Sequence, residues 1–139
     1  MQIERYRPKR IEMNDLIIDQ AYFTRLFPKL SKLKLDVEIF YETKAHLKQE
    51  HLEVLAGAGV RKIQAGIESL SPNSVKKISK GVSVSRYLEF LSDCDELGIQ
   101  CYWNYLHSFP GETASELLSA IPVISDATQQ QPPATFQPA

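Results

Sequence analysis

The chain has 139 residues, of which 43% are hydrophobic and 24% are charged, and its formal net charge is −1. This length and composition predict one globular domain with a modest core. The near-zero charge argues against an electrostatic grip on nucleic acid, and no segment approaches the ~20 apolar residues of a membrane span. Only two cysteines occur, which excludes a disulfide scaffold and makes the cytoplasm the expected location.

Four apolar, strand-like runs recur along the chain, and a helical pattern follows each of them. The predicted strands are residues 10–14, 35–41, 60–67 and 99–106. Strands that alternate with helices predict a parallel sheet of right-handed crossover units, which is an α/β fold. Four units are too few for a closed eight-stranded barrel, so we expect both outer strands to present open edges.

Local signals bound several of the predicted helices. Ser71 followed by Pro72 places a good N-cap residue before proline at the first helical position. Thr113 and Glu116 have the spacing of a capping box, which predicts the start of the last helix. Pro28 interrupts the first helical pattern, so that helix is expected to kink or end early.

Polar residues collect where the predicted strands end. In parallel β/α folds these ends converge on the active site. The residues at these positions are Asn14, Asp15, Glu42, Lys44, Glu68, Ser69, His107 and Ser108. Glu42 and Glu68 also have structural interpretations, and these remain open. Glu42 can interact favourably with the dipole of the following helix, and Glu68 can take part in capping. A glycine at a strand end, such as Gly66, lets a ligand approach the backbone.

No metal site is predicted from the residues. His46, His51 and His107 are scattered without the spacing of metal ligands. Cys94 is expected to be a core residue on an apolar helix face, and Cys101 an inward-facing strand residue.

Taken together, segments 40–44, 55–69, 80–81 and 103–113 resemble the core of radical S-adenosylmethionine (radical SAM) enzymes. The most specific parts are Gly-Ile-Glu-Ser at 66–69 and Phe-Pro-Gly-Glu-Thr at 109–113. More narrowly, the chain resembles the cobalamin-associated branch that modifies ribosomally made peptide precursors (RiPP maturation). The resemblance implies a partial parallel (β/α) barrel over residues 1–128, with about four of six β/α units. The Gln/Pro-rich segment 129–139 is then expected to be a truncated or disordered tail.

The resemblance also implies a cofactor and its site. S-adenosylmethionine (SAM) is the implied small-molecule cofactor, and the full-length enzyme of this branch would add a [4Fe-4S] cluster and cobalamin. Glu68 and Ser69 would lie near the ribose or methionine part of SAM, with Glu42 facing the same cavity. The backbone from Leu106 onward would flank the adenine. The implied cofactor-binding residues are Glu42, Gly66, Glu68, Ser69, Leu106 and Ser108.

The chain departs from the family pattern in two respects. Family enzymes hold the cluster with a C-x3-C-x2-C loop after their first strand, and this sequence contains no such motif. The first strand here matches the second strand of the family. Ser108 stands where the family often has glycine before Phe-Pro-Gly-Glu. The chain is therefore expected to be an inactive fragment, and no catalytic residue or metal ligand is assigned.

Three functional interpretations follow from these observations. The leading one is a fragment of a radical SAM enzyme that modifies or C-methylates a ribosomal peptide precursor. Its expected partners are a peptide substrate and the remaining half of the barrel, without nucleic acid or membrane. The alternative is a non-catalytic, degenerate barrel that still binds SAM or a peptide. The third is an unrelated β/α metabolic enzyme, for which neither a G-x-G-x-x-G nor a Walker motif is present.

Overall fold

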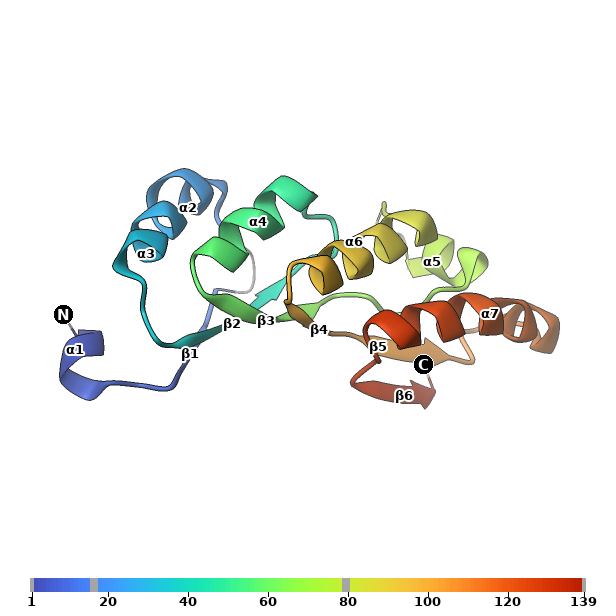
Figure 1. Cartoon of the computed structure of the whole chain (residues 1–139). Helices are drawn as coiled ribbons and strands as arrows, with labels where there is room; N and C mark the ends of the chain where they lie inside the picture. The colour runs from blue at the N-terminus through green and yellow to red at the C-terminus, as the bar shows by residue number, and fades with distance from the viewer. Residues whose placement is uncertain (1, 16–17, 79–80, 139) are drawn as a thin grey trace.

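The computed structural model describes residues 2–15, 18–78 and 81–138 of the chain. Its arrangement is shown in Figure 1. The helices are α1 (Gln2–Tyr6), α2 (Gln20–Arg25), α3 (Phe27–Leu33), α4 (Gln49–Gly57), α5 (Pro72–Ile78), α6 (Val84–Glu96) and α7 (Ala114–Gln130). The strands are β1 (Arg10–Met13), β2 (Glu38–Thr43), β3 (Val60–Ala65), β4 (Gln100–Tyr102), β5 (Asn104–His107) and β6 (Thr135–Pro138).

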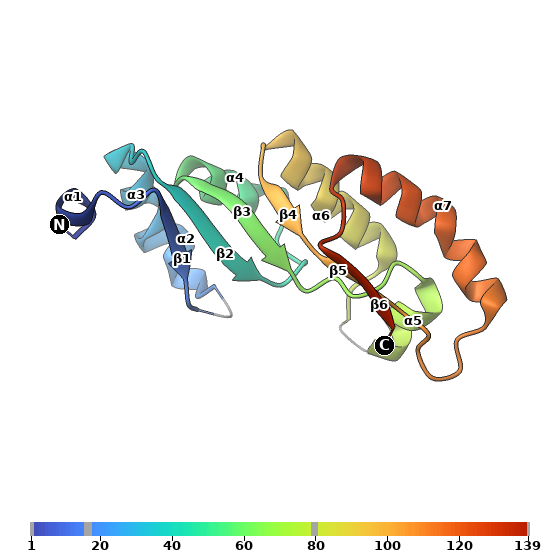
Figure 2. The same cartoon turned by 90° about the horizontal axis from the view of Figure 1, so that it is seen from below.

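A parallel sheet with the order β1-β2-β3-β4 forms the centre of the structure. Helices α2, α3, α4 and α6 lie on one side of this sheet, and Figure 2 shows the strands in front of the helices when the molecule is turned. The second parallel pair, β5 with β6, continues beyond β4. The α/β fold and the partial barrel expected from the sequence are thus confirmed.

The core lies between the sheet and its covering helices. Along β2, Ile39 and Tyr41 are buried while Phe40 and Glu42 are half-buried, so alternate residues face the helices. The helices supply the other half of this layer with fully buried apolar side chains: Leu52, Leu55, Phe90 and Leu91. Burying each such side chain stabilises the fold by about 1.5–3 kcal/mol. The face of the sheet opposite the helices is less buried and can therefore carry polar residues.

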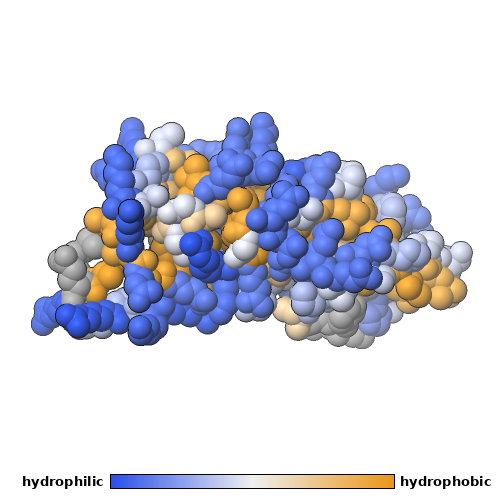
Figure 3. Space-filling view, viewed as in Figure 1, coloured by the Kyte–Doolittle hydropathy of each residue, from blue (hydrophilic) through white to orange (hydrophobic). Residues whose placement is uncertain are grey.

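The surface is mostly hydrophilic on the side shown in Figure 3, with an apolar area at the right-hand end, over α7. The large hydrophobic side chains of α7 that remain exposed are Leu118 and Ile121. Among the residues that the structure describes, no helix has both the length and the apolar character to span a membrane.

The sequence signals that predicted helix ends correspond to helix ends in the structure. Thr113 and Glu116 form the capping box of α7, because each side chain accepts a hydrogen bond from the other residue's backbone N–H. Of the two outcomes expected at Pro28, a kink or an early end of the helix, the structure shows the early end, since α2 stops at Arg25. The helical segment breaks at Leu26, and Pro28 lies in the first turn of α3, where its missing N–H leaves no hydrogen bond unmade.

Two features differ from the sequence-based expectation. The predicted strand 99–106 is divided at Trp103 into β4 and β5. The segment 129–139, expected to be a truncated or disordered tail, contains the last two residues of α7 and the strand β6. Pairing explains the second difference, because β6 runs parallel to β5 with Asn104 opposite Thr135. The extended backbone of this tail thus finds partners that sequence composition does not reveal.

The capping box of α7 makes a testable contribution to stability. Replacing Thr113 with alanine removes the acceptor for the Glu116 N–H, and we expect it to lower the free energy of unfolding by about 1 kcal/mol. The measurement is urea unfolding of the intact chain, followed by circular dichroism. Ser115→Ala, an exposed position in the first turn of the same helix, should change stability much less. Equal effects of the two substitutions would contradict the assignment.

Candidate functional site

A cavity of about 190 Å³ lies where β2 and β3 end. Carboxyl ends of neighbouring parallel strands meet at one edge of a sheet, and ligands bind there in β/α folds. The residues around the cavity come from these two strand ends and from the start of β5. They are Glu42, Thr43, Lys44, Gln64, Ala65, Gly66, Ile67, Glu68 and Asn104.

Strand geometry explains why Glu42 and Gln64 share this cavity. They are register partners on β2 and β3, so they project from the same face of the sheet. Their neighbours Tyr41 and Ile63 are fully buried on the helix-covered face. Glu42 and Gln64 therefore point toward the open face.

The turn after β3 places Glu68 near the same strand end. The Gly66 N–H donates to the carbonyl of Thr43 at 3.2 Å, which extends the β2–β3 ladder past the end of β3. The Ile67 N–H then donates to the carbonyl of Ala65 at 2.8 Å and closes a tight turn. Gly66 itself is exposed at the cavity, so a ligand can approach its backbone.

The charge around the cavity is dominated by carboxylates. Glu42 and Glu68 are both half-buried, whereas Lys44 is exposed. Burial, and next the negative charge of Glu68, raise the pKa of the Tyr87 phenol above its ordinary value. Ionised carboxylates only accept hydrogen bonds, so this edge suits a ligand that offers hydroxyl or ammonium donors.

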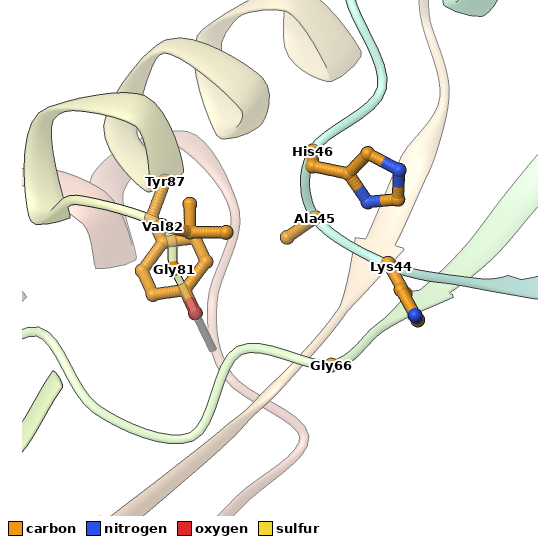
Figure 4. Close-up of a pocket in the computed structure, with 7 residues that line it drawn as sticks. All are labelled: Lys44, Ala45, His46, Gly66, Gly81, Val82 and Tyr87. Atoms are coloured by element: carbon orange, nitrogen blue, oxygen red, sulfur yellow. The ribbon is translucent and has the colours of Figure 1, made fainter. Parts of the chain in front are cut away.

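A second cavity of about 620 Å³ adjoins the first, sharing Lys44 and Gly66 with it (Figure 4). In this view Val82 and Tyr87 lie across from Ala45, and the His46 ring points away from them. Burial and then the nearby positive charges, Lys44 first, lower the pKa of His46. His46 is thus biased toward the neutral imidazole. The complete lining is Lys44, Ala45, His46, Gly66, Gly81, Val82 and Tyr87.

The structure brings together three of the six residues implied to bind the cofactor, along with the strand-end candidate Lys44. Glu42, Gly66 and Glu68 all line the smaller cavity. Ser69 does not line this cavity. It is fully buried, and its Oγ accepts the Ser71 N–H at 3.1 Å. Ser69 therefore holds the turn that leads into α5.

Leu106 and Ser108, the other two predicted residues, belong to β5 and the turn after it. The Leu106 N–H donates to the carbonyl of Glu68 at 2.8 Å, so β5 runs alongside the turn that follows β3. Ser108 is exposed and has a φ of 64°, in the left-handed region. Glycine adopts this conformation without the steric penalty that a Cβ brings. This explains physically why glycine suits the position that Ser108 fills.

Glu112 organises the turn that contains Ser108. Its Oε2 accepts the N–H groups of Ser108 at 2.6 Å and of Phe109 at 3.2 Å. Its Oε1 accepts the hydroxyl of Ser74 on α5 at 2.7 Å. The carboxylate thus ties the Phe-Pro-Gly-Glu turn to a neighbouring helix and has a structural role.

Sequence reasoning missed three polar residues of the cavity, Thr43, Gln64 and Asn104. Gln64 could have been found, because it is two residues before Gly66 and strand alternation puts it on the same face. Asn104 could not, since its place depends on the break of the strand at Trp103. The Asn104 N–H donates to the carbonyl of Ile67 at 3.2 Å.

The cysteines form part of the core, as expected from their patterns. Cys94 on α6 and Cys101 on β4 are both buried. A hydrogen bond with Cys101, together with burial, raises the pKa of the Cys94 thiol. Thiolates are the metal-binding form, so this pair is poorly suited to ligate iron. In the described ranges of the chain, no group of three histidine, cysteine or acidic residues could hold a metal ion.

A parallel β/α sheet, covered by helices on one face and with polar groups at its carboxyl edge, has the architecture of a partial (β/α) barrel. The sequence model of the Radical SAM superfamily matches residues 16–121, which is more than half of the chain. The chain therefore belongs to the radical SAM superfamily.

The chain is also similar to individual known proteins, in sequence or in fold. Over 62 residues the chain is 31% identical to GTP 3',8-cyclase of Alkaliphilus oremlandii (strain OhILAs), covering 45% of this chain and 19% of that protein. Its fold is similar to the radical SAM methyltransferase TsrM from Kitasatospora setae, at a TM-score of 0.75 and 16% identity, over 94% of this chain and 26% of TsrM. Coproporphyrinogen III oxidase (HemN) from Escherichia coli gives a TM-score of 0.67 at 16% identity, over 88% and 29%. The chain thus spans less than a third of the length of each of these relatives.

The left-handed backbone at Ser108 predicts an order of stabilities. Ser108→Gly should unfold at higher urea concentration than Ser108→Ala, because both lack the hydroxyl but only alanine keeps the strained Cβ, a difference of about 1 kcal/mol. Ser108→Val should be the least stable, since a β-branched residue fits this region worst. Urea midpoints of the three variants test the order. An alanine variant as stable as the glycine variant would show that residue 108 does not adopt the left-handed conformation.

Proposed function

We propose that this chain provides part of the SAM-binding site of a radical SAM enzyme. The observation that carries the proposal is the convergence of Glu42, Gly66 and Glu68 from two strand ends on one cavity. SAM offers ribose hydroxyls and an α-ammonium group as donors, and carboxylates are the acceptors that bind such groups most strongly. Membership of the superfamily supports the choice of ligand.

Within this proposal each predicted residue has a role. Glu68 binds the ribose or the methionine end of SAM, and Glu42 accepts from the same ligand across the cavity. Gly66 allows the ligand to approach the backbone. Leu106 and the backbone leading to Ser108 flank the adenine. Ser69 supports Glu68 indirectly, because its hydroxyl holds the turn that follows.

The residues present do not fit a [4Fe-4S] cluster. Such clusters take cysteine thiolates, and the two thiols here are buried on α6 and β4, with the pKa of Cys94 raised. We therefore propose that the cluster ligands belong to a further part of the enzyme, and that this chain alone is silent in radical chemistry. The remaining half of the barrel is then its partner. The protein acts in the cytoplasm, where thiols stay reduced.

The narrower activity that we propose is modification of a ribosomal peptide precursor by C-methylation, with cobalamin bound by the full-length enzyme. The similarity of fold to TsrM supports this choice, since that methyltransferase was solved with cobalamin and a [4Fe-4S] cluster bound. TsrM was also solved with tryptophan and a SAM analogue. A second candidate function is a non-catalytic barrel that binds SAM or a peptide. It is favoured by a polar cavity in a chain whose thiols do not fit a cluster.

The proposed function predicts that Glu68→Gln weakens SAM binding. The neutral amide keeps the size of the side chain but loses the charge, so the dissociation constant should rise by about tenfold, as expected for a charge-assisted hydrogen bond. Isothermal titration calorimetry of SAM into the purified chain makes the measurement. Glu96→Gln, exposed at the end of α6, is the matched control and should leave affinity unchanged.

Two results would contradict the proposal. One is a folded chain with no detectable affinity for SAM, and the other is equal affinity in the wild type and Glu68→Gln. Binding of SAM by the chain without iron agrees with both candidate functions. They are separated by testing whether adding the remaining barrel and its cluster produces SAM cleavage.

A further inference from the structure

Gln131, the residue that follows α7, has a buried polar side chain far along the chain from the candidate site. Only 6% of its surface is exposed. Its Oε1 accepts the Cys101 N–H at 3.0 Å, and its Nε2 donates to the carbonyl of Ile99 at 3.1 Å. Nε2 also lies 3.5 Å from Oδ1 of Asp95, its partner on α6. Both polar ends of the carboxamide are thus satisfied, as burial requires.

These hydrogen bonds resemble those that a neighbouring strand would make at the edge of β4. The Ile99 carbonyl and the Cys101 N–H lie two residues apart along the same edge. One residue of a neighbouring parallel strand would bind two groups with this same spacing. The carboxamide of Gln131 offers one donor and one acceptor, like a peptide group. It therefore occupies the edge of β4 that sequence analysis expected to be open, and β6 pairs with β5 instead.

The backbone near Gln131 anchors the point where the strand breaks. The indole Nε1 of Trp103 donates to the Gln131 carbonyl at 2.6 Å, and the Ala134 N–H donates to the Trp103 carbonyl at 2.6 Å. Trp103 is fully buried between β4 and β5. The segment that follows α7 thus holds both the side chain and the backbone of Trp103.

The course of β5 follows from this anchor. Beyond Trp103, the Asn104 and Leu106 N–H groups donate to the carbonyls of Ile67 and Glu68. These bonds bring β5 to the turn that carries Glu68, and Asn104 lines the cavity. A change at Gln131 can therefore reach the cavity through Trp103 and β5.

We propose that Gln131 is a positioning residue for the candidate site: by binding the β4 edge and Trp103, it fixes β5 against the turn that carries Glu68. The proposal rests on the proposed function only in the choice of SAM as the ligand to be measured. Its structural half concerns hydrogen bonds of the chain itself and is measured without any ligand.

The test uses the full chain with two substitutions of similar shape. Gln131→Met removes both polar groups of the side chain, whereas Gln131→Glu keeps the acceptor for the Cys101 N–H and loses the donor to Ile99. Gln130→Met, at the exposed neighbouring position, is the control. Hydrogen exchange followed by NMR gives protection factors for the amides of Cys101, Asn104 and Leu106. Gln131→Met should lower all three at least tenfold, with little change in the β1–β2 ladder.

The variant Gln131→Glu supplies a conservative rescue. Above its pKa the introduced carboxylate has no proton for the Ile99 carbonyl, and it lies near Asp95, the charged partner of the native amide. Below that pKa the neutral acid can donate to Ile99 as Nε2 does. Protection at Asn104 and Leu106 should therefore be low at pH 8 in Gln131→Glu and recover as pH falls. Gln131→Met should show no recovery, and the wild type and Gln130→Met no loss.

SAM affinity, measured by calorimetry, completes the test, with a several-fold loss expected for Gln131→Met and none for Gln130→Met. Loss of protection at Cys101 alone, with Asn104 and Leu106 unchanged, would overturn the proposal. So would unchanged SAM affinity in a variant whose β5 has lost protection. If the wild type binds no SAM, the proposed function fails, and the exchange data still decide whether Gln131 positions β5. If Gln131→Met does not fold, the pH dependence of Gln131→Glu decides it.

Discussion

Every backbone donor and acceptor along a buried strand edge needs a partner, and at the edge of β4 a side chain meets this requirement. The Gln131 carboxamide satisfies Cys101 and Ile99 in place of a neighbouring strand. The β4 edge is thereby closed, Trp103 is held by the segment that follows α7, and β5 can leave the line of β4. The arrangement of β5, β6 and the carboxyl edge of β3 depends on the Gln131 side chain, which takes the place of a neighbouring strand.

The second constraint is that helices cover only one of the two faces of the sheet. Helices bury the face that carries Tyr41 and Ile63, and burial of these apolar side chains stabilises the fold. The opposite face carries Glu42 and Gln64, which are register partners and need not be apolar. A polar cavity at the carboxyl edge is therefore a direct consequence of strand alternation in a sheet covered on one side. The same alternation keeps Cys101 in the core and away from that cavity.

How much of the site could be predicted is clearest from single residues. Glu42 and Glu68 were predictable because each directly follows or ends an apolar run, and strand ends converge in β/α folds. Ser69 occupies an equally plausible position in the sequence, but the turn after β3 directs it into the core, where it binds the Ser71 N–H. A shift of one residue reverses the direction of a side chain, and sequence pattern does not define the turn closely enough to resolve it.

Local sequence patterns were enough to predict the alternation of strands and helices, the start of α7 and the family, because these depend on periodicity, capping and motifs within short segments. It did not determine the break at Trp103, the pairing of β6 or the place of Asn104. Those features depend on Gln131, which lies 28 residues beyond Trp103 in the chain and contacts it because α7 packs against α6. Only tertiary structure brings such distant groups together, and the need to satisfy buried polar groups then decides how they pair.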